Sequence, residues 1–282
     1  MTRTIGFLHP GSMGISLAAS AQNTGHAAIW ASEGRSQATR DRAEAHALTE
    51  KHDLRSLCEA CDTIVCICPP AAASDVAASV IATGFRGLYI DANAISTART
   101  HQIHADLSDA AIRFVEGGVI GGPAWKPGRT WLYLAGPDAA EAAACFGAGP
   151  LETHVLGTEI GLAAALKVCF AAYTKGTSAL LSAILANAEA YGVRDALMAQ
   201  WARNGSTFAI DTENRIRRVT SRAWRFAGEL EESADTFAAA GLPDGFSRAA
   251  AEVYRRTTHF KDAPEPPPIE DVLRALLPPG DE

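Results

Sequence analysis

Apolar and polar positions alternate in short blocks along the first half of the chain. Apolar runs, expected to be β-strands, occupy residues 3–9, 26–32, 62–70, 87–93, 112–121 and 128–136. Segments expected to be helical lie between or after them, at residues 12–25, 36–47, 72–84, 95–110 and 138–147. Alternation of this kind predicts an α/β fold with a Rossmann-type, doubly wound parallel sheet. A ligand of such a sheet binds at the carboxyl ends of the strands.

The second half has a different pattern. Residues 159–191 contain no proline and are apolar nearly all round, which predicts one long helix that is buried on most sides. Further helices are expected at residues 195–204, 211–240, 245–257 and, after the proline-rich spacer 264–268, at 269–277. The expected domains are therefore a sheet domain at residues 1–155 and an all-α domain at 156–282. A long apolar helix in a small domain also predicts a homodimer, since a second copy would cover it.

Composition narrows the class of partner. The chain has 282 residues, 48% of them hydrophobic, and a net charge of −7. No nucleic-acid partner is expected, because phosphate binding requires clustered lysine and arginine. We identify no membrane-spanning segment and no signal peptide in the sequence, so we expect a cytoplasmic protein.

Four of the six cysteines lie close together in the sequence. Cys58 and Cys61 form a C-x-x-C pair, which Cys66 and Cys68 follow. Such spacing can indicate zinc. However, Cys66 and Cys68 fall in an expected buried strand and the other pair in the preceding helical segment, so we expect reduced core thiols and no metal site.

The segment TIGFLHPGSMGISLA, residues 4–18, has the strand–turn–helix context of a dinucleotide-binding fingerprint, G-x-G-x-x-G. His9 replaces the first glycine, whereas Gly11 and Gly14 keep the second and third positions. Backbone approach to a pyrophosphate and close helix packing are therefore retained, and the helix N-terminus still offers amides to an anion. The candidate cofactor-binding residues of this turn are His9, Pro10, Gly11, Ser12, Met13 and Gly14.

The end of the second strand usually distinguishes NAD from NADP. Here Ser32, Arg35 and Ser36 form a set suited to a 2′-phosphate, with Arg40 as a further candidate, and Glu33 is the contrary signal. We therefore expect NADP, with NAD as the alternative. Cys68 and Pro69, at the end of the expected strand 62–70, are further candidate cofactor-binding residues.

Five segments together resemble the β-hydroxyacid dehydrogenases, which are related to 6-phosphogluconate dehydrogenase and the imine reductases. They are GFLHPGSMG (6–14), DANAIS (91–96), EGGVIGGPA (116–124), GTEIGLAAALKVCFAA (157–172) and FKDA (260–263). The resemblance extends over nearly the whole chain. It implies that Lys167 is the catalytic residue and that Lys261 lies by the cofactor.

Candidate substrate-binding residues are Asn93, Gly121, Gly122 and Thr174. Four positions depart from the family pattern. Ile120 and Asn93 each replace a serine, and Phe170–Ala171 replaces two asparagines. These changes remove usual partners of a hydroxy-acid carboxylate, so a bulkier or less acidic small molecule is expected as substrate.

The surroundings of Lys167 agree with an acid–base role. The residue lies on an apolar helix, where burial lowers the pKa of a lysine and suits it to proton transfer. We expect an NADP-dependent oxidoreductase that acts on a C–OH/C=O pair. An imine reductase, or a cofactor-binding scaffold without turnover, is the alternative.

Overall fold

The computed structural model describes residues 2–261 and 263–278. The chain divides into two compact units, residues 1–167 (unit 1) and residues 168–282 (unit 2). The boundary expected near residue 155 falls inside a strand of the sheet, so unit 1 continues through that strand into the following helix.

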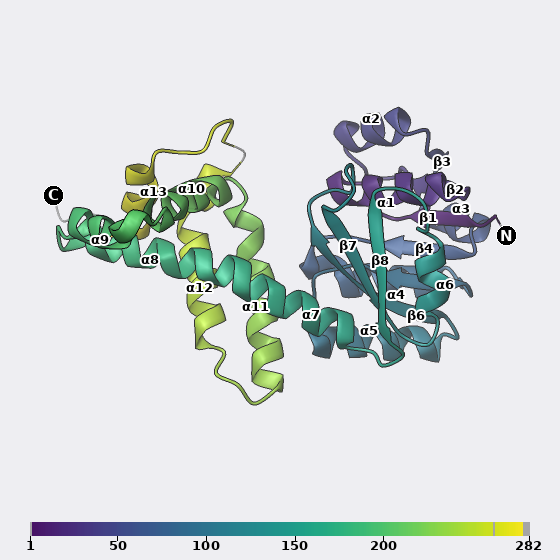
Figure 1. The fold of residues 1–282 in the computed structure, drawn as a ribbon. Helices are drawn as coiled ribbons and strands as arrows, with labels where there is room; N and C mark the ends of the chain where they lie inside the picture. Colours follow the sequence, from purple (N-terminus) through teal and green to yellow (C-terminus); the bar gives the residue numbers. More distant parts are fainter. Residues whose placement is uncertain (1, 262, 279–282) are drawn as a thin grey trace. The chain divides into compact units, whose positions relative to one another are not determined.

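Unit 1 is built on an eight-stranded sheet with the order β3-β2-β1-β4-β5-β6-β7-β8 (Figure 1). The strands are β1 (Thr4–Phe7), β2 (Ala27–Ala31), β3 (Thr49–Lys51), β4 (Thr63–Cys66), β5 (Leu88–Asp91), β6 (Arg113–Gly121), β7 (Thr130–Ala135) and β8 (Leu151–Gly157). Neighbouring strands are parallel except β6 and β7. The expected α/β class with a mostly parallel, doubly wound sheet is confirmed.

Helices cover both faces of this sheet. The helices of unit 1 before its last one are α1 (Ser12–Asn23), α2 (Gln37–Ala45), α3 (Leu54–Ala60), α4 (Ala73–Ala82), α5 (Thr97–Asp109) and α6 (Ala139–Ala144). Side chains of α1, α2 and α6 share one apolar core with the sheet, and those of α3, α4 and α5 share another. Two separate cores on one sheet are the packing of a doubly wound fold.

The sequence analysis missed β3 and β8, which form the two edges of the sheet. The residues of β3 are Thr49, Glu50 and Lys51, and most residues of β8 are exposed or half-buried. An edge strand that faces solvent carries no apolar run, so the hydrophobic pattern does not reveal it.

Unit 2 is helical, as expected. Its elements are the end of α7 (Leu162–Ala171), a π-helical turn (Ala172–Gly176), α8 (Thr177–Ala190), α9 (Arg194–Trp201), α10 (Phe208–Thr220), α11 (Ala223–Ala239), α12 (Gly245–Arg256) and α13 (Ile269–Leu276). The helix expected at 211–240 is two helices that separate at residues 221–222. α8 packs against α10, α12 and α13, so it forms the centre of this unit.

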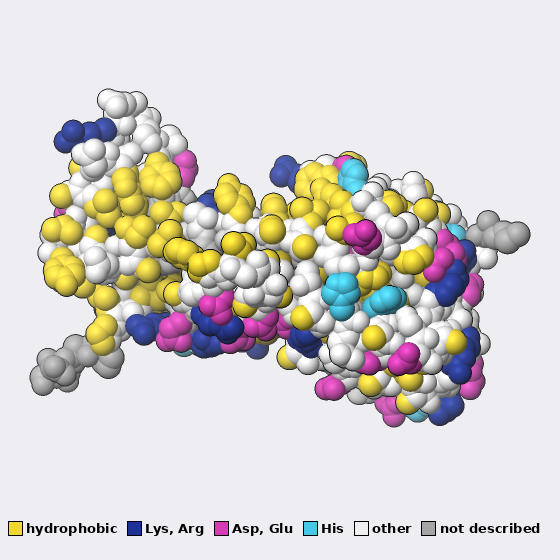
Figure 2. Space-filling model, turned by 90° about the horizontal axis from the view of Figure 1, so that it is seen from below, with side chains coloured by type: hydrophobic (Ala, Val, Ile, Leu, Met, Phe, Trp, Pro, Cys, Tyr) yellow, Lys and Arg dark blue, Asp and Glu magenta, His cyan; other side chains and the backbone are white. Residues whose placement is uncertain are grey.

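One helical stretch, Leu162–Ala190, is long and apolar enough to cross a membrane by length and composition alone. The expectation that no segment meets this test was therefore wrong. Only 33% of its most apolar window is buried within the chain. Figure 2 also shows hydrophobic side chains gathered on one face of the helical unit.

Candidate active site at the carboxyl ends of the strands

The site lies at the switch point of the sheet. The chain passes from β1 outward to β2 and β3, then returns to β4 on the other side of β1. Loops that leave β1 and β4 therefore diverge, and ligands of doubly wound sheets bind in the crevice between them. The turn 8–11 follows β1, and the amide of Leu8 still donates to the carbonyl oxygen of Val65 at 3.2 Å.

Gly14 is needed by the geometry of this turn. A Cβ atom at Gly14 would lie 2.3 Å from the carbonyl oxygen of His9 and 3.0 Å from Cγ2 of Ile67. Only glycine allows α1 to begin this close to the end of β1. By contrast, a Cβ atom at Gly11 would meet nothing within 4 Å. The two glycines thus have different tasks: Gly14 permits packing inside the protein, and Gly11 leaves open space outside the turn.

The start of α1 is suited to an anion. The first amides of an α-helix have no partner within the helix, and their dipoles favour negative charge. Gly11 caps α1 and has no side chain to accept from these amides, and the first turn, Ser12 to Ile15, carries no acidic residue. His9 and Met13 are half-buried, Pro10 is buried and Ser12 is exposed. The turn therefore fits a dinucleotide phosphate although its first glycine is missing.

The set at the end of β2 is partly engaged in internal contacts. Ser32 is buried, and its carbonyl oxygen accepts a hydrogen bond from Nη2 of Arg40 at 2.7 Å. Ser36 is exposed, and its hydroxyl lies 3.1 Å from that of Thr39. Arg35 is half-buried, and among the described residues no hydrogen-bond partner contacts its Nε. Arg35 is therefore the cation of this set that has a buried donor without a partner.

Sequence reasoning missed Arg42 of α2. Its Nη1 donates to the carbonyl oxygen of Pro10 at 3.1 Å, which fastens α2 to the nucleotide turn. A long arginine in a polar surface helix gives no pattern that would separate it from its solvated neighbours.

Asn93 holds the loop that follows β4. Its Oδ1 accepts from the amide of Cys68 at 2.6 Å, and its Nδ2 donates to Sγ of Cys66 at 3.4 Å. The amide of Asn93 in turn donates to Oδ1 of Asp91 at 2.8 Å. Asn93 is 5% exposed, so its side chain acts on the protein itself. Pro69, next to Cys68, is exposed.

An acidic residue, Asp91, lies beside Asn93 in the buried part of this edge. Burial raises the pKa of Asp91 to about 7, and the hydrogen bonds from Asn93 oppose that shift. Oδ2 of Asp91 is buried and, within the described residues, has no hydrogen-bond partner. The carboxyl ends of β4 and β5 therefore enclose buried polar groups whose presence is not explained by packing of the apolar core.

Lys167 lies against the carboxyl end of β6. Its Nζ donates to the carbonyl oxygen of Val119 at 2.5 Å, and the residue is half-buried. Close approach of α7 to β6 depends on Gly118, where a Cβ atom would lie 2.8 Å from the carbonyl oxygen of Ala163 and 3.3 Å from Cβ of Lys167. The amine is thus held at the same edge of the sheet as the nucleotide turn. Because β4 and β5 lie between β1 and β6, the ends of β1 and β6 are three strand spacings apart, or about 14 Å.

Glu116 fixes the start of α7. Its carboxylate accepts from the amides of Gly161 at 2.6 Å, Ala163 at 3.0 Å and Ala164 at 3.2 Å. Burial raises the pKa of Glu116, and these three hydrogen bonds act in the opposite direction. A carboxylate at a helix N-terminus stabilises the helix. Glu116 therefore positions the helix that carries Lys167, a role that its place inside a strand motif did not reveal.

The two glycines at the end of β6, Gly121 and Gly122, differ in the same way as those of the nucleotide turn. Gly121 has φ +112°, and a Cβ atom there would lie 2.1 Å from the carbonyl oxygen of Arg129. A Cβ atom at Gly122 would meet nothing within 4 Å. Gly122 leaves its backbone accessible, as a substrate-binding loop requires, whereas Gly121 serves the β6–β7 connection.

Two candidate residues belong to unit 2. Thr174 lies in the π-helical turn, where its hydroxyl donates to the carbonyl oxygen of Phe170 at 2.7 Å and its own carbonyl accepts from Arg215 at 2.6 Å. π-helical turns free backbone groups and are frequent at functional sites. Lys261 places its Nζ 4.4 Å from the ring centroid of Trp224, and Asp262 of the FKDA segment lies outside the described residues.

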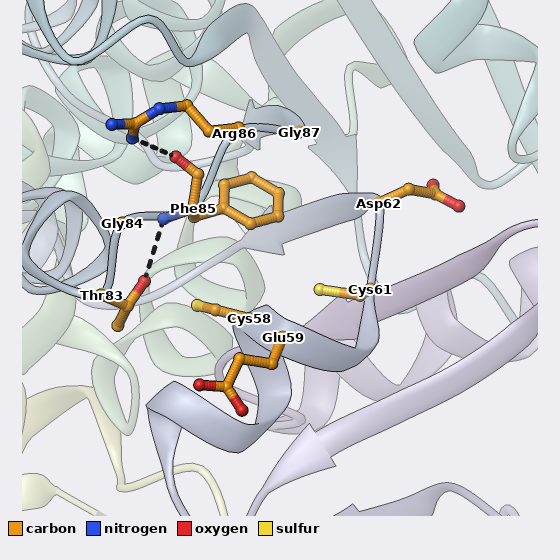
Figure 3. Close-up of a pocket in the computed structure, with 9 residues that line it drawn as sticks. All are labelled: Cys58, Glu59, Cys61, Asp62, Thr83, Gly84, Phe85, Arg86 and Gly87. Carbon is orange, nitrogen blue, oxygen red and sulfur yellow. Dashed lines mark hydrogen bonds between the residues drawn. The ribbon is translucent and has the colours of Figure 1, made fainter.

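A surface pocket of about 350 Å³ lies at the opposite edge of the sheet, before β4 and β5 begin. Figure 3 shows Cys58 and Cys61 in its wall, together with Glu59 and Phe85. None of the candidate site residues lines it. The pocket is therefore distinct from the crevice at the carboxyl ends. Cys58 and Cys61 lie at the opposite edge of the sheet from the other two cysteines of their sequence cluster.

Comparison with known families agrees with this geometry. Residues 4–145, half of the chain, match the NAD binding domain of 6-phosphogluconate dehydrogenase. The chain belongs to this family. In this 6-phosphogluconate dehydrogenase-type protein, residues 188–257 match a second model, a domain of unknown function (DUF1932). The NAD-binding model includes the nucleotide turn, the end of β2 and the loop after β4.

Solved structures show the same fold over nearly the whole chain. The conserved protein MTH1747, described as structurally similar to 3-hydroxyacid dehydrogenases, is 25% identical with a TM-score of 0.66, over 91% of this chain and 97% of that one. Mycobacterium tuberculosis 3-hydroxyisobutyrate dehydrogenase with L-serine is 19% identical with a TM-score of 0.72, over 98% of this chain and 99% of that one. A Streptomyces aurantiacus imine reductase is 15% identical with a TM-score of 0.54, over 98% of this chain and 100% of that one. A comparison with curated proteins found no match. This 6-phosphogluconate dehydrogenase-type protein is an NAD(P)-dependent dehydrogenase or reductase.

Proposed function

We propose that the protein transfers a hydride between NADP and the C–OH/C=O group of a small molecule, with Lys167 as general acid and base. The observation that supports this most is the amine of Lys167 at the carboxyl end of β6, 2.5 Å from the carbonyl oxygen of Val119. This is the edge of the sheet where ligands of the fold bind.

Each part of the site has one task in this proposal. The start of α1 binds the dinucleotide phosphates, and a nicotinamide cofactor supplies or accepts the hydride when bound. The ammonium of Lys167 donates a proton to the oxygen of the carbonyl substrate. In the reverse direction, the neutral amine removes the hydroxyl proton. Gly122 offers an accessible backbone to the substrate, and Glu116 keeps α7 in place.

Replacement of Lys167 tests the chemical step. Lys167→Met should lower kcat by about 100- to 10,000-fold, the usual contribution of a general acid–base group. The assay would follow NADPH absorbance with a panel of short aldehydes, ketones and hydroxy acids. Lys51→Met, at a half-buried lysine at the end of β3, is the matched control and should keep full turnover. Unchanged turnover in Lys167→Met would refute the acid–base role.

Arg35 supports the proposed preference for NADP. It follows β2, and among the described residues its Nε has no hydrogen-bond partner, whereas Glu33 is exposed. We expect a KM for NADPH at least about tenfold below that for NADH, and Arg35→Ala should raise the KM for NADPH far more than that for NADH. A wild-type preference for NADH would overturn this assignment.

The alternatives are separable by the same assays. An imine reductase would turn over cyclic imines and leave the carbonyl panel untouched. A scaffold would bind NADPH without turnover of either. We propose in addition that the functional form is a homodimer, because only 33% of the most apolar window of the long helix, residues 162–190, is buried within one chain.

A further inference from the structure

Three potential metal ligands meet at the switch point, although the sequence predicted none. His9 follows β1, Cys66 ends β4, and Cys68 lies in the loop after it. Their ligand atoms all lie within 4.8 Å of one another. The sequence analysis assigned both cysteines to a buried strand. In the structure β4 ends at Cys66, so Cys68 leaves the strand and turns back toward its neighbour.

The spacing of the sulfur atoms fits tetrahedral coordination. Sγ of Cys66 and Sγ of Cys68 are 3.9 Å apart. A tetrahedral zinc ion with Zn–S bonds of about 2.3 Å requires an S···S distance of about 3.8 Å. The two thiols therefore already have nearly the separation that a shared zinc ion would impose.

The imidazole of His9 is available as the third ligand. Its Nδ1 is buried and, among the described residues, has no hydrogen-bond partner. A buried polar nitrogen without a partner is destabilising. A metal ion bound at the two sulfurs would give the imidazole a partner. A nucleotide phosphate bound at the amides of α1 would not require contact with the imidazole.

Asn93 holds the two cysteines in place. It accepts from the amide of Cys68 at 2.6 Å and donates to Sγ of Cys66 at 3.4 Å. Hydrogen bonds of this kind orient metal ligands in known sites. The side chain is 5% exposed, so water does not compete for these contacts.

The two thiols already share a hydrogen bond, in which Sγ of Cys66 donates to Sγ of Cys68 at 3.9 Å. A divalent cation would take the place of the thiol protons, which are released to solvent, and would be bound by both thiolates.

We propose that His9, Cys66 and Cys68 form a three-ligand site for a thiophilic divalent cation of the zinc class, with the fourth coordination position open. Two sulfurs and one imidazole nitrogen are the donor set that such cations prefer. A bound cation would connect the end of β1 to the end of β4 and fix the nucleotide turn. This inference does not depend on the proposed reaction.

Cobalt is the probe, because thiolate-bound Co²⁺ is coloured and zinc is not. The full chain is reduced with a phosphine under argon and titrated with CoCl₂, without nucleotide. We expect one equivalent to bind, with a thiolate-to-cobalt charge-transfer band and the strong visible bands of tetrahedral coordination. Added ZnCl₂ should displace the cobalt and remove both.

Two variants and one control locate the site. Cys68→Ser and His9→Ala should weaken cobalt binding by more than the roughly 10- to 100-fold that follows loss of a residue which only hydrogen-bonds a ligand. Cys169→Ser, at an exposed cysteine of unit 2, should leave the spectrum unchanged. If either variant fails to fold, X-ray absorption of the wild-type cobalt complex should show two sulfur neighbours and one imidazole.

Two outcomes would overturn the proposal: absence of the charge-transfer band, or a band that survives in Cys68→Ser. Turnover by Lys167 is measured separately with NADPH. Failure of one test therefore leaves the other interpretable.

Discussion

At the scale of single residues, glycines that look equivalent in the sequence have separate roles. The fingerprint treats Gly11 and Gly14 as two members of one motif. In the structure a Cβ atom at Gly14 would collide with the carbonyl oxygen of His9, whereas the space beside Gly11 is open. The close packing at Gly14 predicts that a substitution there affects stability. The open space beside Gly11 predicts that a substitution there affects cofactor binding.

Alanine substitutions separate these roles. Gly14→Ala should lower the free energy of unfolding by about 1–3 kcal/mol, the usual effect of overpacking, because its Cβ atom would lie 2.3 Å from a backbone oxygen. Gly11→Ala should change stability by about 0.5 kcal/mol but weaken NADPH binding, since its Cβ atom would occupy the space of the phosphates. Urea denaturation and NADPH fluorescence titration measure the two quantities. Equal effects of both variants on stability would contradict this division.

At the scale of secondary-structure elements, the hydrophobic pattern predicted the strands that are buried and missed those at the edges. β4 and β5 are buried along their whole length and were expected, whereas β3 and β8 are polar or exposed edges. The turn between β1 and α1 and the helical position of Lys167 could be predicted because motif and context agree, whereas the roles assigned to them stay predictions. The contact of Glu116 with the start of α7 could not be predicted, since the partners are 45 or more residues apart in the chain.

Glu116 gives a prediction on the pH dependence of stability. Its pKa is raised above the ordinary value of 4.5, mainly by burial, so the folded state binds its proton more tightly than the unfolded state. This group's contribution to stability is therefore fully present below pH 4.5 and is lost as the pH rises through the raised pKa. Glu116→Gln removes that dependence.

Urea midpoints of wild type and Glu116→Gln, compared at about pH 4 and about pH 8, measure this effect. The wild type should lose stability relative to the variant toward the higher pH. Glu152→Gln, at an exposed edge-strand position whose side chain accepts from the indole of Trp131, is the control and should follow the wild-type profile. Parallel profiles for wild type and Glu116→Gln would contradict the predicted proton linkage.

At the scale of the whole molecule, the two units bury their apolar residues to different extents. Unit 1 has two closed cores on either side of its sheet. Unit 2 leaves large apolar side chains in solvent, among them Tyr173 at 67% exposure and Leu180 at 58%. Monomeric proteins seldom leave contiguous apolar surface of this kind uncovered, so a second copy of the chain is the partner we expect.

A charge placed on this helix tests the expected homodimer. Leu180→Glu should convert the dimer to a monomer, because a carboxylate without a partner would be buried in the interface. Leu156→Glu, at a β8 position that is 40% exposed, is the matched control and should remain dimeric. Light scattering at micromolar concentration measures the mass of all three proteins. A monomeric wild type would refute the dimer, and a wild type that floats with phosphatidylcholine vesicles would assign the apolar face to a membrane instead.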